Sequence, residues 1–178
     1  MAKREVVIYP AEVLKKPTQK VEDINDRIIQ IVEDMWDTMY ADDGVGLACN
    51  QIGERYSILV MDTTIKEDVQ PVKLTLINPE IIASEGTQKS KEGCLSVPGI
   101  VAEIDRAYWV KVKALTPKGQ EEIFEFEGFP AVVVQHEIDH LKGITMLDRL
   151  KGIKKRLALD KYKKILRRLE RYKKQQGD

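Results

Sequence analysis

The chain has two histidines, and they lie four residues apart in the segment HEIDH (136–140). On an α-helix, residues i and i+4 lie one above the other on the same face, so His136 and His140 can bind one metal ion. Glu137 is rotated by about 100° from His136, where it can flank the metal and act as general base for an activated water molecule. The alternative is two ordinary helix histidines with Glu137 on a solvated face. We disfavour it because three polar groups on an otherwise apolar helix need a partner.

A catalytic metal site needs a third protein ligand. Downstream, Met146 stands where a metzincin would carry its third histidine, Glu170 lies in a basic segment, and Asp148 has no further support. Upstream, Cys94 lies in the segment EGCLS (92–96). A thiolate with two imidazoles and one open position is a valid catalytic set, although a single cysteine is more often an ordinary core residue.

A third segment, GVGLACNQ (44–51), contains closely spaced glycines. Such glycines indicate tight backbone geometry near a ligand or a neighbouring element. The segment is not a phosphate-binding loop, because it lacks G-x-G-x-x-G and a following Lys-Ser/Thr. A functional loop and a plain turn both remain as interpretations.

The three segments, in this order, resemble those of the peptide deformylases, which carry G-x-G-L-A-A-x-Q, E-G-C-L-S and Q-H-E-x-D-H. Here they are GVGLACNQ (44–51), EGCLS (92–96) and QHEIDH (135–140), and the one departure is Cys49 in place of alanine. The opening YPAEVLKKP is also similar to the family's N-terminal region, so the resemblance covers about residues 5–150.

The resemblance implies metal ligands Cys94, His136 and His140, with Glu137 as general acid and base. It also implies that the Gln51 side chain and the backbone N–H of Leu95 donate to the oxyanion. The resemblance also implies a substrate that begins with a formylated methionine. We expect five residues near these motifs to bind that methionine, and plain core packing is the alternative: Gly44, Val45, Gly46, Phe129 and Val133.

The implied activity is a metal-dependent hydrolase that removes the N-formyl group from N-formylmethionine at the start of nascent polypeptides and releases formate. The implied cofactor is one divalent metal ion, with Fe(II) expected and zinc, nickel or cobalt as substitutes. Two alternatives stay open. One is a zinc peptidase of the H-E-x-x-H type, which would not need Cys94, and the other is a metal-stabilised protein that binds RNA or the ribosome.

Three residues near the motifs carry weaker expectations. Ligating histidines usually donate their second N–H, so Asp139 is expected to orient a neighbouring imidazole. Glu92 is expected to pair with Arg106, with a surface acid as the alternative. Cys49 is expected to be a small core residue rather than a ligand.

The expected fold is α+β, with antiparallel strands packed around a central buried helix that carries the H-E-x-x-H motif, plus N-terminal and C-terminal helices. Residues 1–20 are expected to be irregular apart from a short helix between Pro10 and Pro17. Apolar spacings predict a helix over 25–40, and a buried helix is expected to begin near Pro130 and end at Gly143. Strands are predicted over 57–62 and 74–83. A hairpin is predicted from 101–115 and 121–128, joined by the turn 116–119.

The zero net charge conceals an asymmetry, because 29 basic and 29 acidic groups are unevenly placed. Residues 151–178 hold 12 basic and three acidic side chains, a net charge of +9, which leaves −9 for residues 1–150. We expect a catalytic domain over 1–150 and a basic helical extension over 151–178. Its basic groups favour contact with the ribosome or its RNA, and a solvated helix face is the alternative. Its packing stripe is expected to hold five apolar residues: Ile153, Leu157, Tyr162, Leu166 and Leu169.

The remaining composition indicates a folded cytoplasmic protein without a membrane span. With 43% hydrophobic residues the chain is too apolar to be disordered. It has no run of 18 apolar residues and no N-terminal segment typical of a signal peptide. Its two cysteines are too few for a disulfide scaffold.

Overall fold

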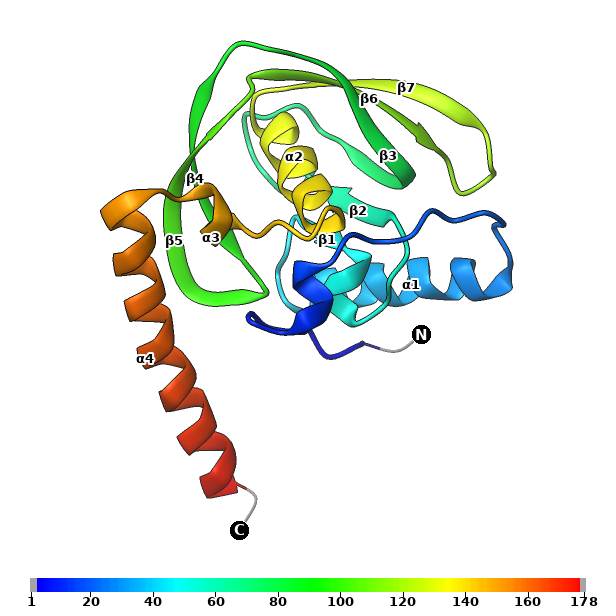
Figure 1. The fold of residues 1–178 in the computed structure, drawn as a ribbon. Helices are drawn as coiled ribbons and strands as arrows, with labels where there is room; N and C mark the ends of the chain where they lie inside the picture. The colour runs from blue at the N-terminus through cyan, green and yellow to red at the C-terminus, as the bar shows by residue number, and fades with distance from the viewer. Residues whose placement is uncertain (1–2, 177–178) are drawn as a thin grey trace.

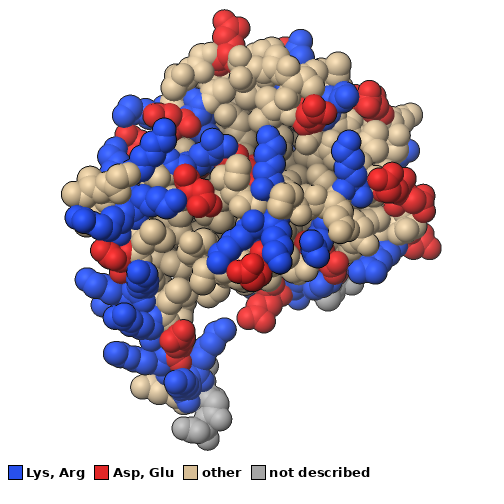
Figure 2. Space-filling model, in the orientation of Figure 1, with Lys and Arg blue, Asp and Glu red and all other residues tan. Residues whose placement is uncertain are grey.

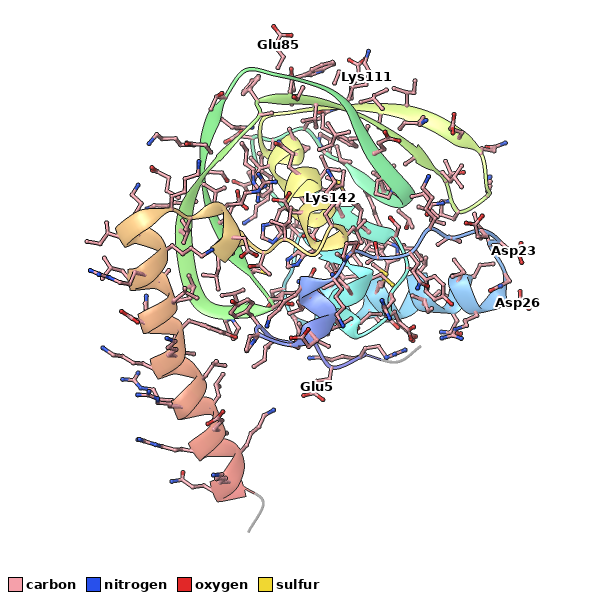
Figure 3. All side chains as sticks on the ribbon, viewed as in Figure 1. Glu5, Asp23, Asp26, Glu85, Lys111 and Lys142 are labelled. Carbon is pink, nitrogen blue, oxygen red and sulfur yellow. The ribbon has the colours of Figure 1, made fainter. Side chains whose placement is uncertain are left out.

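The helix that carries both histidines, α2 (Phe129–Leu141), lies in the middle of the molecule with strands on several sides of it (Figure 1). The computed structural model describes residues 3–176, so the first two residues of the expected catalytic domain and the last two of the expected extension lie outside the described residues. Within this range the fold is α+β with antiparallel sheets, as expected. Figure 3 shows side chains filling the space between α2 and the surrounding strands, with Lys142 just past the helix end.

Five strands form one antiparallel sheet in the order β1-β2-β3-β6-β7, and two strands form a separate antiparallel pair. The bounds of the larger sheet are β1 (Gly46–Ala48), β2 (Ile58–Asp62), β3 (Lys73–Glu85), β6 (Trp109–Leu115) and β7 (Glu121–Glu127). The pair consists of β4 (Gln88–Cys94) and β5 (Val97–Arg106). The other helices are α1 (Asp26–Ala41), α3 (Met146–Arg149) and α4 (Gly152–Gln176), with short 3-10 turns η1 (Glu12–Lys15) and η2 (Cys49–Ile52).

Helix α2 is buried almost all round because its sequence is apolar almost all round. Its first turns hold Ala131 and three consecutive valines, all buried. Gly143 follows its end with a φ of +75°, and a Cβ there would lie 2.7 Å from the Lys15 carbonyl carbon. Glycine therefore ends the helix as predicted, and it also lets η1 pack tightly against that end.

Helix α1 confirms the predicted amphipathic helix. Its buried residues include Ile28, Ile31, Met35 and Met39, which recur at spacings of three and four. The Asn25 side chain accepts a hydrogen bond from the Ile28 N–H at 3.2 Å and so caps the helix start. This face packs on β1 and β2 and closes the side of the sheet away from the hairpin β6–β7.

The predicted strand over 101–115 is wrong in one respect, because it is two strands in two different sheets. The chain leaves β5 at Arg106 and enters β6 at Trp109. At the break, the Gln135 side chain on α2 accepts from the Ala107 N–H at 3.0 Å and donates to the Ala107 carbonyl at 2.9 Å. A side chain far along the sequence thus replaces the ladder hydrogen bonds at this point, which no local pattern reveals. The hairpin of β6 and β7 is confirmed.

Helix α4 lies along β5 and extends beyond it (Figure 1). The expected apolar stripe is only partly right. Tyr162 is 1% exposed and its hydroxyl donates to the Tyr9 carbonyl at 2.6 Å, whereas Ile153 and Leu157 are 64% and 60% exposed. The helix packs through the neighbouring stripe of Ala158, Leu159, Tyr162, Ile165 and Leu166.

None of the helices formed by residues 3–176 combines the length and the apolar content that crossing a membrane requires.

Candidate active site

Cys94, His136 and His140 meet where the end of β4 approaches α2. One potential ligand atom from each residue lies within 4.8 Å of the other two, and the Cys94 Sγ is 3.1 Å from the His140 Nε2. Both imidazoles are buried, and Cys94 is partly exposed. Among the described residues this is the one cluster of three or more such side chains with metal-binding geometry. The structure therefore brings together the three residues that the sequence motifs singled out.

Glu92 fixes the orientation of the His136 ring. Its Oε1 lies 2.8 Å from the His136 Nδ1. A carboxylate only accepts, so Nδ1 carries a proton and Nε2 is the nitrogen left to bind a metal ion. Burial lowers the pKa of His136, but contacts with Cys94 and Glu92 outweigh burial and raise it well above its ordinary value.

Arg106 pairs with Glu92 as predicted, through two hydrogen bonds of 2.8 Å. Both side chains are buried. Burial raises the pKa of Glu92, but the hydrogen bonds from Arg106 and His136 outweigh burial, and the net pKa lies below the ordinary value. Glu92 therefore stays a carboxylate beside the metal-binding cluster.

The expectation that Asp139 orients an imidazole is wrong. Its carboxylate accepts from the Arg106 Nη1 at 2.6 Å and from the Arg149 Nε at 2.8 Å. Two guanidinium groups outcompete a neutral imidazole N–H for a buried carboxylate because the resulting hydrogen bonds are charge-assisted. The His140 Nδ1 makes no hydrogen bond to the described residues, whereas the His140 carbonyl accepts from the Asn50 side chain at 2.6 Å.

Glu137 is buried beside the cluster, against the backbone of β1. Its Oε1 would lie 2.7 Å from a Cβ placed on Gly46, and its Oε2 has no hydrogen-bond partner among the described residues. Burial raises the pKa of Glu137 to about 7. A carboxyl group with that pKa can both take up and give back a proton near neutrality.

Gln51 reaches the cluster from η2. Its Oε1 accepts from the Ala48 N–H at 2.8 Å, which turns its Nε2 toward Ser96 Oγ at 3.1 Å and Cys94 Sγ at 3.6 Å. Leu95 lies in the two-residue turn between β4 and β5, beside Cys94. Ser96 was not singled out from the sequence, although its place in the EGCLS motif was a usable signal.

A cavity of about 650 Å³ opens onto these groups. Its lining includes ten of the residues named from the sequence: Gly44, Val45, Gly46, Gln51, Cys94, Leu95, Phe129, Val133, His136 and Glu137. It also includes residues 97–101 at the start of β5, which sequence reasoning missed because it placed the strand start at 101. Cys49 does not line the cavity. It lies fully buried in the core between α1 and the sheet, and burial raises its pKa to about 12, which confirms its interpretation as a core residue.

Of the strands that border the cavity, β1 and β4 are edge strands among the described residues. β1 pairs only with β2 in the large sheet, and β4 pairs only with β5. Edge strands present backbone donors and acceptors that can pair with an extended peptide. The site thus combines three potential metal ligands, a buried carboxyl group and a peptide-sized opening.

Comparison with known proteins decides the family. A family model described as polypeptide deformylase matches residues 3–156. The chain belongs to the polypeptide deformylase family. It is 56% identical over 164 residues to the peptide deformylase of Aquifex aeolicus (strain VF5), an alignment that covers 92% of this chain and 97% of that relative.

Solved deformylase structures share the fold. A crystal structure of a peptide deformylase from Legionella pneumophila superposes with a TM-score of 0.87 at 38% identity, covering 96% of this chain and 99% of that one. A peptide deformylase from Ehrlichia chaffeensis in complex with actinonin superposes with a TM-score of 0.85 at 37% identity, covering 92% and 98%. Deformylases are metal-dependent hydrolases of protein biosynthesis that remove the N-formyl group from nascent peptides. The Cys-His-His cluster is a group that can bind the metal.

Proposed function

We propose that this chain hydrolyses the formamide bond of N-formylmethionine at the start of nascent polypeptides, at a single divalent metal ion held by Cys94, His136 and His140. The observation that carries the proposal is the convergence of these three ligands on one point beside the buried Glu137. Fe(II) is the proposed metal, with zinc, nickel or cobalt as substitutes.

The donor set fits such an ion. One thiol and two imidazoles are ligands that iron, cobalt, nickel and zinc all accept, and three protein ligands leave a position open for catalysis. Glu92 holds His136 in the tautomer that a metal requires. When bound, the cation would act as a Lewis acid that polarises the formyl carbonyl and lowers the pKa of water.

Glu137 is the proposed proton carrier. Its carboxylate takes a proton from the attacking water, whose oxygen bonds to the formyl carbon. When the carbon–nitrogen bond breaks, Glu137 gives that proton to the leaving amine, so the products are formate and the free N-terminus. Two observations support this role: Glu137 lines the cavity, and its buried Oε2 has no hydrogen-bond partner among the described residues.

Gln51 and Leu95 are the proposed oxyanion donors. The Gln51 Nε2 is held toward Cys94 by the bond from the Ala48 N–H to its Oε1, so little reorganisation is needed when charge develops. The backbone N–H of Leu95 is the second donor. The proposed methionine pocket is the apolar part of the cavity, formed by Gly44, Val45, Gly46, Phe129 and Val133.

The deformylase interpretation is favoured over both alternatives. A peptidase of the H-E-x-x-H type would not require Cys94, yet Cys94 lies 3.1 Å from His140. A purely structural metal site would be closed by four ligands, whereas this cluster has three and faces a cavity.

Residues 1–150 are the proposed catalytic domain, and 151–178 the proposed extension that contacts the ribosome or its RNA. Figure 2 shows the Lys and Arg side chains crowded along α4. The proposed location is the cytoplasm, where formylated chains are synthesised.

The decisive test measures formate released from a formyl-Met-Ala-Ser peptide by anaerobically purified, Fe(II)-loaded protein. Chelator treatment and Glu137→Gln should each abolish release. Cys94→Ala should lose both bound metal and activity. Absence of formate from the loaded wild-type protein would overturn the proposed function, and full activity of Cys94→Ala would favour the peptidase-like site.

A further inference from the structure

The cavity mouth carries two lysines that the proposed chemistry does not use. Lys66 follows β2 in the loop 63–72, and Lys91 lies on β4, three residues before Cys94. Both line the cavity, and neither side chain forms a hydrogen bond or salt bridge with the described residues. They come from different elements, because Lys66 lies in the loop after β2 and Lys91 lies on β4.

Three acidic residues also line the cavity, and none of them forms a salt bridge with Lys66 or Lys91. Glu92 and Glu137 also line the cavity, but Glu92 is paired with Arg106, and Glu137 is buried beside the metal ligands. Asp43 is the remaining acid of the lining.

Across the β4–β5 pair, Lys91 faces Glu103. Glu103 itself forms a 3.0 Å salt bridge with Lys89. The hydrogen bond and charge of Lys89, together with the charges of Lys154 and Lys91, lower the pKa of Glu103.

The exposed charged residues of the lining are therefore Lys66, Lys91 and Asp43, so basic groups outnumber acidic ones there in a body whose net charge is negative. Glu67 and Asp68 follow Lys66 in its loop but do not line the cavity.

An extended peptide bound along the edge of β4 would pass beside Lys91, which lines the cavity. The formyl end must lie at Cys94 and the two histidines, so the rest of the chain exits through the mouth. A strand rises about 3.3 Å per residue, so Lys91 lies roughly 10 Å along β4 from Cys94. An extended peptide paired along the β4 edge has its third residue at that level.

We propose that Lys66 and Lys91 are specificity determinants that favour substrates with an acidic side chain near the third residue. This inference rests on the proposed function and adds a preference beyond formylmethionine. An exposed ion pair changes an equilibrium by about 1.5- to 5-fold, so two lysines should give a combined preference of about 2- to 25-fold. The preference should shrink as salt screens the charges.

The test compares kcat/KM for three amidated peptides, formyl-Met-Ala-Glu-Ala, formyl-Met-Ala-Gln-Ala and formyl-Met-Ala-Lys-Ala, at low and high salt. The Glu peptide should exceed the Lys peptide in the wild-type protein. The double variant Lys66→Glu/Lys91→Glu should reverse that order. The matched control Lys16→Glu/Lys118→Glu, with the same change in net charge at exposed positions outside the cavity lining, should keep it.

Equal kcat/KM for the Glu and Lys peptides in the wild-type protein, or an unchanged ratio in the Lys66→Glu/Lys91→Glu variant, would overturn the inference. Hydrolysis of the neutral Gln peptide reports separately on the proposed function. If that peptide were not hydrolysed, the proposed function would fail, and calorimetric affinities of the Glu and Lys peptides would still decide the charge preference.

Discussion

At the scale of single residues, the site depends on how closely the backbone of β1 approaches α2. A Cβ on Gly46 would lie 2.7 Å from the Glu137 Oε1 and 2.9 Å from the Val133 Cγ1. Such distances force one of those side chains to move. Glycine is therefore required at position 46 by its missing side chain, which explains why the closely spaced glycines of the segment matter for chemistry.

Gly46→Ala should consequently lower kcat by about 10²-fold, because displacing a catalytic group by roughly 1 Å has an effect of that order. Formate release under saturating peptide measures it. The matched variant is Gly93→Ala, whose added Cβ would lie 3.8 Å from the Ile100 carbonyl, an ordinary contact. Comparable losses in both variants would show that the close approach at Gly46 is not what positions Glu137.

Glu92 provides the second prediction at this scale. Glu92→Gln keeps an acceptor for His136 but removes the charge that Arg106 and His136 share. Because partners of ligating histidines typically change metal affinity by 10- to 100-fold, we expect metal loss to a competing chelator at about 10- to 100-fold lower chelator concentration. Bound metal is read by elemental analysis after dialysis. Wild-type retention in Glu92→Gln would exclude an orienting role for the Glu92 charge.

The sequence was most informative about residues with rare, periodic spacing. The i, i+4 histidines and the residue between them required only the geometry of a helix, and the Glu92–Arg106 pair was correctly expected. Asp139 was misassigned because its partner Arg149 lies on α3, and nothing in the local sequence ranks a guanidinium above an imidazole as a partner. Ser96 was missed because its contact with Gln51 joins η2 to the turn after β4.

At the scale of elements, α4 is part of the core of the protein as well as a carrier of charge. Tyr162 packs with residues of β5 and α3 in one apolar cluster, and Gly99 on β5 leaves room for Ile165, because a Cβ there would lie 2.7 Å from the Ile165 Cδ1. Burial raises the pKa of Tyr162 to about 12, so its hydroxyl stays protonated and keeps donating to the Tyr9 carbonyl.

Tyr162→Ala should therefore reduce the free energy of unfolding by about 3–5 kcal/mol, the usual cost of deleting a buried aromatic side chain. Urea denaturation followed by circular dichroism measures the change. Leu157→Ala on the same helix removes a side chain that is 60% exposed and should cost less than about 1 kcal/mol. Equal costs for the two variants would mean that α4 is not anchored through Tyr162.

Elements with a clear period or a continuous apolar run were predicted, whereas β1 and β4, which have neither, were not. Helices α1 and α2 and the hairpin of β6 and β7 follow from apolar spacing and turn residues. β4 has the sequence QKSKEGC, which lacks apolar alternation, and β1 has three residues, too few for any pattern. The predicted apolar stripe on α4 differs from the observed one by about one position. Ile153 and Leu157 are apolar but exposed, and only the packing against β5 distinguishes the two faces of the helix.

At the scale of the whole molecule, the zero net charge separates into a body of −9 and a terminal segment of +9. Opposite charges in one chain would favour collapse of the basic segment onto the body, yet α4 is held by apolar contacts on one side and keeps its Lys and Arg side chains on the surface (Figure 2). This arrangement leaves a basic surface free for a polyanion while its apolar side stays buried. Removing residues 151–178 would uncover the Tyr162 cluster, so charge reversal is the cleaner way to test the proposed ribosome contact.

The triple variant Lys161→Glu/Lys164→Glu/Arg168→Glu changes three exposed residues on α4. Each neutralised phosphate contact adds roughly 0.7–0.9 to the slope of log affinity against log salt, so this variant should bind ribosomes at least about tenfold more weakly at moderate salt and with a shallower slope. Co-sedimentation with ribosomes over a salt series measures both the affinity and the slope.

The control Lys16→Glu/Lys118→Glu/Lys142→Glu makes the same change in net charge at exposed positions off α4 and should co-sediment like the wild-type protein. Release of formate from a short peptide should be similar in all three proteins, because the changed residues lie outside the cavity lining. If the α4 variant co-sedimented as well as the control at every salt concentration, the basic helix would not be the ribosome-binding surface.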